Sequence, residues 1–136
     1  MGVLFCIEIH HPIILMYFSV IMKRFLKSFW YALKGLVYAF KTQLNFKIHC
    51  FSGVFVIALG LYLNLSVTEW LWIILAIALV LIVELINTAI EVLVDLVSPQ
   101  QHPKAGAIKD ISAAAVLVSA LLALGIGLLI FVPKLI

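Results

Sequence analysis

Three long apolar segments constrain this chain more than any other feature of its sequence. They cover about residues 48–65, 70–97 and 111–132, and each is near or above the roughly 17 to 25 residues that a helix needs to cross a bilayer. None shows the apolar–polar alternation of a barrel strand. With 66% hydrophobic and 11% charged residues in a chain of 136, we predict an all-α membrane protein with three transmembrane helices.

The segment that precedes the first span, residues 23–47, has the pattern of an amphipathic helix. Its lysines Lys23, Lys27, Lys34 and Lys41 gather within about 40° on a helical wheel, and phenylalanine and leucine side chains occupy an opposite arc. Such a helix lies in the membrane surface with its lysines toward lipid phosphates. We therefore predict an interfacial helix ahead of the spans. Its lysines either only anchor this helix or also hold an anionic nucleotide or phosphorylated product.

The distribution of basic residues indicates an orientation. Eight of the nine lysine and arginine residues lie before the first span or between the second and third spans, and only Lys134 lies elsewhere. Because cytoplasmic segments carry the excess of lysine and arginine, we expect the N-terminal region and residues 98–110 in the cytoplasm. The basic residues are too dispersed for a surface that binds nucleic acid.

Residues 1–21 precede a single predicted membrane domain, residues 22–136. They are apolar but interrupted by polar residues and Pro12, and the run 13–22 is too short to span a bilayer. A signal peptide is not expected, because no basic region precedes the apolar run and no small-residue cleavage site follows it. Met22 stands just before the amphipathic helix. The segment is therefore either a weak interfacial extension or the product of an upstream start.

One face of the second apolar segment carries polar side chains. At about 100° per residue, Glu84, Asn87, Glu91 and Asp95 fall within an arc of about 80°. We call these four residues the polar stripe. A carboxylate in hydrocarbon costs at least about 2.5 kcal/mol on insertion scales, so several on one face predict a functional site that faces a bundle interior or a partner.

The residues of the polar stripe lie at different depths. At 1.5 Å per residue, Glu84 is about 21 Å from Trp70 and Glu91 is about 31 Å from it, against a hydrocarbon core of about 30 Å. If Trp70 marks the outer surface, Glu84 is within reach of a lipid alcohol and can act as its general base. Glu91 and Asp95 lie nearer water and suit Mg²⁺ with substrate phosphates. With nearby lysines, these are the components of phosphoryl transfer.

Two other interpretations of the polar stripe remain open at this point. Polar side chains also join helices through interhelical hydrogen bonds, and they also line paths for protons or ions. The sequence has neither the GxxxxGK[ST] motif of P-loop proteins nor the GxGxxG motif of protein kinases. A nucleotide site in this chain must therefore be of another type.

Four motifs resemble a known family. The runs ELINTAIEVLVDL and HPKAGAIKDISAAAVL, with GLVYAF and NFKIH upstream, are similar to the prokaryotic diacylglycerol kinase and undecaprenol kinase family of small integral-membrane lipid kinases, over about residues 23–133. The resemblance implies a homotrimer in the bacterial inner membrane, with sites shared between subunits. It also implies transfer of the γ-phosphate of ATP to a lipid alcohol with Mg²⁺, in phospholipid or cell-envelope lipid recycling.

The same resemblance implies roles for individual residues. Glu84 matches the catalytic base, with Asn87 beside it, and Glu91 matches a metal-binding glutamate. Gln43 stands where the family often has a second metal-binding glutamate. An amide oxygen ligates a hard cation without adding charge, so metal affinity should fall, or Asp95 should take its place. The positions that match the family's nucleotide-binding residues are Arg24, Tyr31, Asp95, His102, Lys109 and Asp110.

The choice of lipid and two alternative functions stay open. NFKIH and NTAIEVLVDL are more similar to the undecaprenol kinase branch, so undecaprenol is expected ahead of diacylglycerol. The first alternative is a non-enzymatic oligomeric membrane protein that conducts ions or protons along the polar stripe, which leaves Lys109 and Asp110 without a role. The second is a family member made inactive by Gln43.

Overall fold

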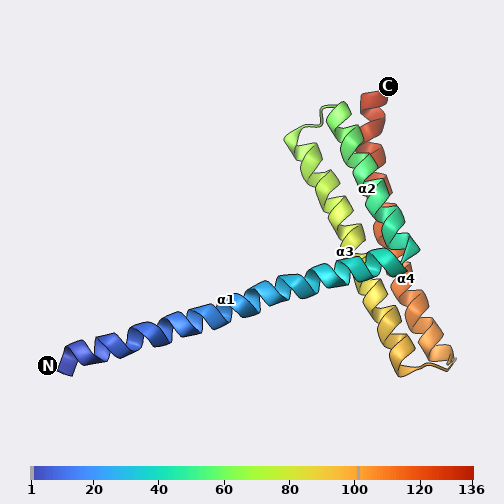
Figure 1. The fold of residues 1–136 in the computed structure, drawn as a ribbon. Helices are drawn as coiled ribbons and strands as arrows, with labels where there is room; N and C mark the ends of the chain where they lie inside the picture. The colour runs from blue at the N-terminus through green and yellow to red at the C-terminus, as the bar shows by residue number, and fades with distance from the viewer. Residues whose placement is uncertain (1, 101) are drawn as a thin grey trace. The chain divides into compact units, whose positions relative to one another are not determined.

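In the computed structural model, the described part of the chain consists of four helices and short connections, without strands. The structure describes the backbone of residues 2–100 and 102–136, and the side chains of residues 17, 20–100 and 102–136. The helices are α1 (Gly2–Thr42), α2 (Leu44–Tyr62), α3 (Val67–Val97) and α4 (Pro103–Leu135) (Figure 1). α2, α3 and α4 are each long and apolar enough to cross a membrane. The prediction of an all-α protein with three spans is thereby confirmed. The side chains of the expected N-terminal extension fall mostly outside the described residues.

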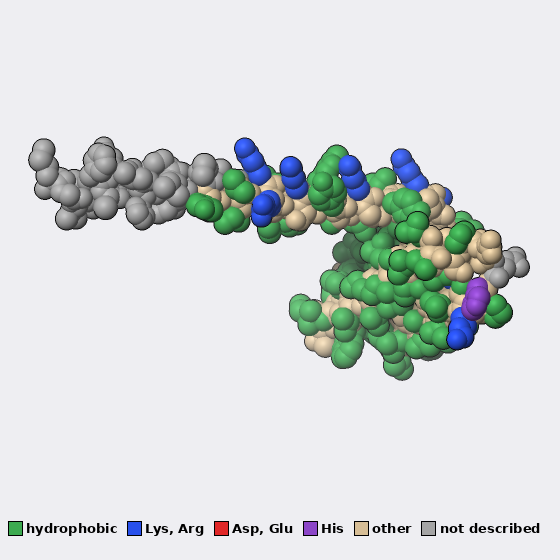
Figure 2. Space-filling model, turned by 90° about the horizontal axis from the view of Figure 1, so that it is seen from below, with side chains coloured by type: hydrophobic (Ala, Val, Ile, Leu, Met, Phe, Trp, Pro, Cys, Tyr) green, Lys and Arg blue, Asp and Glu red, His purple; other side chains and the backbone are tan. Residues whose placement is uncertain are grey.

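The chain divides into two units, Met1–Tyr38 and Ala39–Ile136. The first unit contains most of α1, along which Figure 2 shows blue Lys and Arg side chains among green hydrophobic ones. Within it, the rings of Phe25 and Phe29 pack edge to face with centroids 4.9 Å apart. The Lys34 ammonium lies 5.5 Å from the centre of the Trp30 ring. An aromatic and basic helix of this kind fits the predicted interfacial helix, whose place at the membrane surface stays a prediction.

A single residue, Gln43, separates α1 from α2. Its backbone is extended, with φ −104° and ψ 117°, although its N–H still donates a hydrogen bond to the Ala39 carbonyl oxygen at 2.8 Å. The sequence places this boundary near residue 47, because neither proline nor glycine marks the break. Gln43 is the N-cap residue of α2, but its side chain makes no capping hydrogen bond.

The turn between α2 and α3 is short and capped. Asn64 lies in the left-handed region with φ 51°, which asparagine tolerates better than most residues. Ser66 and Glu69 form a capping box at the start of α3, in which the Ser66 N–H donates to Glu69 Oε2 at 2.7 Å. Glu69 Oε2 also lies 3.2 Å from the Lys134 ammonium near the end of α4. The capping box begins α3 at Val67. The ion pair joins the N-terminal end of α3 to the C-terminal end of α4.

Helix α3 is the centre of the second unit. α2 and α4 both pack on α3, whereas the backbones of α2 and α4 do not come within packing distance of one another. The core cluster consists of Leu65, Ile73 and Phe131 with partly buried neighbours. α2 has 19 residues and α3 has 31. Because a tight turn joins them, α2 covers only about the first half of α3, and its first turns lie near the part of α3 that carries Glu84.

Candidate functional site

The polar stripe begins inside the bundle. Glu84 is 1% exposed and Asn87 is 6% exposed, in a helix whose other large side chains mostly face outward. Thr88, also buried, donates its hydroxyl hydrogen to the Glu84 backbone oxygen at 2.9 Å. Its hydrogen bond thus uses the backbone and leaves the Glu84 carboxylate for other partners. His49 of α2 lies near this carboxylate.

Two oxygen atoms of the polar stripe are buried without a partner. Asn87 Nδ2 donates to Glu91 Oε1 at 3.1 Å, which fixes the orientation of the Asn87 amide. Among the described residues, Glu84 Oε2 and Asn87 Oδ1 are buried and accept no hydrogen bond. Because the large majority of buried polar atoms have partners, these two acceptors indicate a partner from outside this chain. A hydroxyl group can donate a hydrogen bond to Glu84 Oε2, and either a cation or a hydrogen-bond donor suits Asn87 Oδ1.

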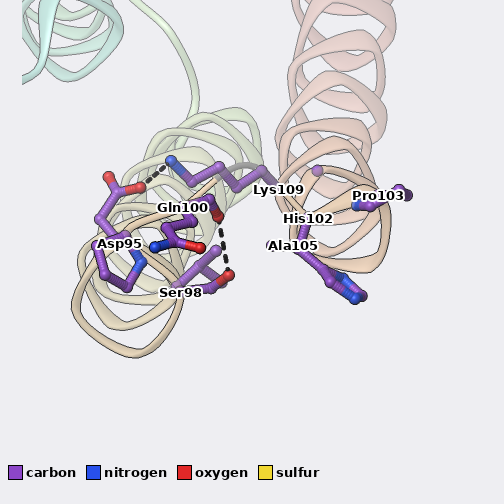
Figure 3. A pocket seen from close by; sticks show the side chains of 10 residues that line it. Asp95, Ser98, Gln100, His102, Pro103, Ala105 and Lys109 are labelled. Carbon is purple, nitrogen blue, oxygen red and sulfur yellow. Dashed lines mark hydrogen bonds and ion pairs between the residues drawn. The ribbon is translucent and has the colours of Figure 1, made fainter.

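A polar pocket of about 540 Å³ lies at the other end of the stripe. We call it the loop pocket, because its walls are the end of α3, the connection 98–102 and the start of α4. In Figure 3 the Lys109 side chain reaches across it to form an ion pair with Asp95, and the Ser98 hydroxyl donates to the Gln100 backbone oxygen at 3.2 Å. The lining residues are Val94, Asp95, Ser98, Pro99, Gln100, His102, Pro103, Ala105, Gly106 and Lys109.

The start of α4 forms one wall of the loop pocket. His102 is its N-cap, with Nδ1 accepting a hydrogen bond from the Lys104 N–H at 3.2 Å. Pro103 follows in the first turn, where its fixed φ favours a helix start. A polar loop was expected here up to residue 110, but the cap and the proline begin the helix at Pro103. Lys109 therefore lies on α4, and the positive end of this helix and the Lys109 ammonium border the same pocket.

The structure brings some of the predicted site residues together and leaves others apart. Asp95, His102 and Lys109 border the loop pocket, and Asn87 contacts Glu91. Asp110 is exposed and does not line that pocket. Gln43 lies at the break between α1 and α2. Arg24 and Tyr31 lie on α1 in the first unit, and their part in the site stays a prediction.

The donors present suit a hard cation that is held partly by substrate. Among the described residues, no three His, Cys, Asp or Glu side chains lie close enough together to hold a metal ion. Glu91 and the unpartnered Asn87 Oδ1 offer only oxygen atoms. Mg²⁺ prefers oxygen and often takes one or two carboxylates together with substrate phosphates and water. These oxygen ligands therefore fit an Mg²⁺ ion that is bound partly by nucleotide phosphates better than an Mg²⁺ ion bound by protein ligands alone.

Three contributors to the site were missed from the sequence. Ser98 and Gln100 line the loop pocket, but polar residues in a loop carry no signal of their own. His49 lies within the NFKIH motif, and its position in a membrane segment was a signal that could have been used. A histidine so placed is by default a functional candidate.

Comparison with known proteins shows which family the chain resembles. A family model described as prokaryotic diacylglycerol kinase matches residues 30–131. An undecaprenol kinase of Bacillus subtilis is 44% identical over 114 residues, which cover 84% of this chain and 93% of that protein. A diacylglycerol kinase of Synechocystis is 44% identical over 111 residues, which cover 81% of this chain and 63% of that protein. A diacylglycerol kinase of Haemophilus influenzae is 34% identical over 104 residues, which cover 76% of this chain and 88% of that protein.

Proposed function

This chain belongs to the prokaryotic diacylglycerol kinase family of membrane lipid kinases, and we propose that it transfers the γ-phosphate of ATP to the hydroxyl group of a membrane lipid, with Mg²⁺. The observation that carries this proposal is the buried Glu84 carboxylate with its unpartnered Oε2, on the same helix as the loop pocket. One end of the stripe thus offers a proton acceptor within the bundle. The other end offers a polar pocket for phosphates, bordered by the Lys109 ammonium and the N-terminal end of α4.

Glu84 is the proposed general base. The lipid hydroxyl donates its hydrogen to the Glu84 carboxylate, and its oxygen attacks the γ-phosphorus of ATP. A bond forms between the lipid oxygen and phosphorus, and the bond between phosphorus and the bridging β–γ oxygen breaks to release ADP. The proton passes to Glu84 and then to water. A base so positioned typically contributes 10²- to 10⁴-fold to a rate, as an order-of-magnitude figure.

Lys109 is the proposed phosphate ligand of the loop pocket. Its ammonium borders the pocket together with the N-terminal end of α4, so both place positive potential where the nucleotide phosphates would lie. Asp95 holds Lys109 across the pocket through their ion pair. His102 shapes the same wall by capping α4. Arg24, Tyr31 and Asp110 are also proposed to contribute to nucleotide binding.

Glu91 and Gln43 are the proposed ligands of Mg²⁺, and Asn87 is the proposed catalytic residue beside Glu84. The metal would neutralise charge on the transferring phosphates, and Asn87 orients Glu91 through the 3.1 Å hydrogen bond. Gln43 would add an uncharged oxygen from the break between α1 and α2.

Replacing Glu91 with glutamine should raise the Mg²⁺ requirement. The amide keeps the size of the side chain but removes its charge, so the Mg²⁺ concentration for half-maximal rate is expected to rise at least about tenfold. A Mg²⁺ titration of the initial rate at saturating ATP measures this change. The same half-saturation concentration in the variant and the unmodified protein would exclude Glu91 as a ligand.

Introducing a glutamate at Gln43 should have the opposite effect. A carboxylate at a position that touches the metal adds charge to the site, so Gln43→Glu is expected to lower the Mg²⁺ concentration for half-maximal rate by about tenfold. The matched control is Asn45→Glu, which adds the same charge at an exposed position two residues along α2. If both variants shift the titration equally, the effect comes from general electrostatics and Gln43 does not touch the metal.

The lipid proposed for this chain is undecaprenol ahead of diacylglycerol. The undecaprenol kinase of Bacillus subtilis is 44% identical, with 93% of its length covered. The diacylglycerol kinase of Synechocystis is equally identical, but only 63% of its length is covered. We further propose a homotrimer in the bacterial inner membrane, with the loop pocket on the cytoplasmic side. An assembly would supply partners for acceptors that one subunit leaves unpaired.

A further inference from the structure

Two buried serines lie on the face of α4 that packs against α3. Ser112 is 7% exposed and Ser119 is 5% exposed. Together with the buried Val116, they fall within an arc of about 60° on a helical wheel. Within the second unit, α4 packs on α3 and not on α2, so α3 is the helix that covers this face. The reaction described above uses neither serine.

Two ion pairs fix the register between the antiparallel helices α3 and α4. They are Asp95–Lys109 near one end and Glu69–Lys134 near the other. Glu84 lies eleven residues before Asp95 and fifteen residues after Glu69. Because both helices rise about 1.5 Å per residue, the same steps along α4 lead from Lys109 to residue 120 and from Lys134 to residue 119. The two counts agree to within one residue, so the buried Ser119 lies level with Glu84.

The Ser119 hydroxyl group keeps its capacity to accept a hydrogen bond. It donates its hydrogen to the Val116 carbonyl oxygen of its own helix at 2.8 Å. A serine hydroxyl has one hydrogen and two acceptor lone pairs, so Ser119 Oγ can still accept. Glu84 Oε2 is a buried acceptor without a partner. Two acceptors at the same level can bond only through a hydrogen, and the proposed reaction delivers one when Glu84 takes the proton of the lipid hydroxyl.

We propose that Ser119 is a positioning residue that accepts a hydrogen bond from the protonated Glu84 carboxyl group. This inference rests on the proposed role of Glu84 as general base and adds a partner for the acid that the reaction forms. The lipid oxygen leaves its proton on the Glu84 carboxylate as it bonds to phosphorus. The carboxyl group then turns about its terminal torsion, which is broad in glutamate, and its O–H donates to Ser119 Oγ. Because a buried O–H without a partner is costly, Ser119 stabilises the protonated form of the base.

Two variants of Ser119 separate its hydroxyl group from its size. Alanine removes the hydroxyl group, whereas cysteine keeps a side chain of similar size with a sulfur that accepts hydrogen bonds only weakly. The matched control is Ser112→Ala, because Ser112 is buried on the same face and also donates to its own helix, to the Lys109 carbonyl oxygen at 2.9 Å. Ser112 lies seven residues from Ser119, which is about 10 Å along α4.

Both Ser119→Ala and Ser119→Cys should lower kcat for lipid phosphorylation by about tenfold, the effect of leaving one buried donor without its partner. KM for undecaprenol and KM for ATP should stay unchanged, because the hydrogen bond forms only after the proton has moved. Ser112→Ala should have the kcat of the unmodified protein. Initial rates in mixed micelles, with each substrate varied at saturating concentrations of the other, measure these constants.

Three kinetic results would overturn the inference. The first is an unchanged kcat in Ser119→Ala. The second is a normal kcat in Ser119→Cys beside a low one in Ser119→Ala, which would show that Ser119 only fills space between α3 and α4. The third is an equal loss in Ser112→Ala, which would assign the effect to the packing of this face as a whole.

A second measurement is independent of turnover. Infrared spectra of protein with isotope-labelled glutamate carboxyl groups are recorded at neutral and acidic pH, and the C=O stretch of protonated Glu84 is the band that is missing in Glu84→Gln. Loss of a hydrogen bond raises this frequency, so the band should move upward in Ser119→Ala and stay in place in Ser112→Ala. An unchanged frequency in Ser119→Ala would contradict the inference even if the kinase is active. If the unmodified protein phosphorylates no lipid, the proposed function fails, and the band still decides whether the two side chains meet.

Discussion

Replacing Glu84 with glutamine is expected to lower kcat for lipid phosphorylation by about 10²- to 10⁴-fold, the range that a general base contributes. The amide has the shape of the carboxyl group but cannot accept the proton of the lipid hydroxyl. The fold should survive, because the Thr88 hydroxyl bonds the Glu84 backbone oxygen and not its side chain. The KM for ATP and the oligomeric mass should therefore stay as in the unmodified protein.

The matched control is Glu69→Gln on the same helix. Glu69 takes part in the capping box of α3 and the ion pair with Lys134, at the far end of α3 from the loop pocket. Its loss should cost stability and leave kcat unchanged. Steady-state assays at saturating lipid and ATP compare the two variants. A Glu84→Gln protein with normal kcat would remove Glu84 from the role of base.

Replacing Lys109 with methionine is expected to lower kcat/KM for ATP by about 10²-fold or more, the cost of losing one preorganised group that stabilises transition-state charge. Methionine keeps the length and apolar stem of lysine without its ammonium. It also leaves Asp95 without its ion-pair partner at the edge of the pocket, where the unpaired carboxylate repels phosphates. KM for the lipid should change much less, because the loop pocket is polar and lies at the other end of the polar stripe from Glu84.

Lys104→Met is the control for this second prediction. Lys104 lies on the first turns of the same helix and is exposed, but it does not line the loop pocket. Removing its charge changes the net charge of the protein by the same amount. Equal losses of kcat/KM for ATP in the two variants would show that the use of ATP depends on the net charge of the protein. Lys109 would then have no specific role.

The three spans and the buried face of α3 could be predicted from the sequence, because each depends on one periodic pattern. Long apolar runs without alternation predicted three spans, which the structure confirms. The 100° periodicity placed Glu84 and Asn87 on one face of a helix, and both side chains are buried. A carboxylate in an apolar helix can avoid hydrocarbon only by facing inward, so this burial follows from the energetic cost alone.

Helix boundaries were less predictable because they depend on single residues. The break at Gln43 has no proline or glycine to mark it. The start of α4 was placed too late, because KAGAIKD has the composition of a loop although His102 and Pro103 cap and begin a helix there. The N-terminal preference of proline in helices was the available signal.

The apolar groove between α2 and α4 could not be predicted from the sequence. It exists because α2 and α4 both pack on α3 without approaching one another. The lining residues come from three helices, and none of them is unusual in an apolar segment. The positions of Arg24 and Tyr31 relative to the site depend in the same way on how parts of the chain assemble, which no local pattern specifies.

Phosphate transfer by the purified protein tests the central claim most directly. Protein in mixed micelles receives ATP labelled at the γ-phosphate, with undecaprenol and diacylglycerol offered in parallel, each with and without Mg²⁺. We predict Mg²⁺-dependent label in the lipid fraction, more in undecaprenol than in diacylglycerol, and none above background in Glu84→Gln. A folded oligomer of the unmodified protein that labels neither lipid would contradict the account, and an inactive family member or a non-enzymatic assembly would take its place.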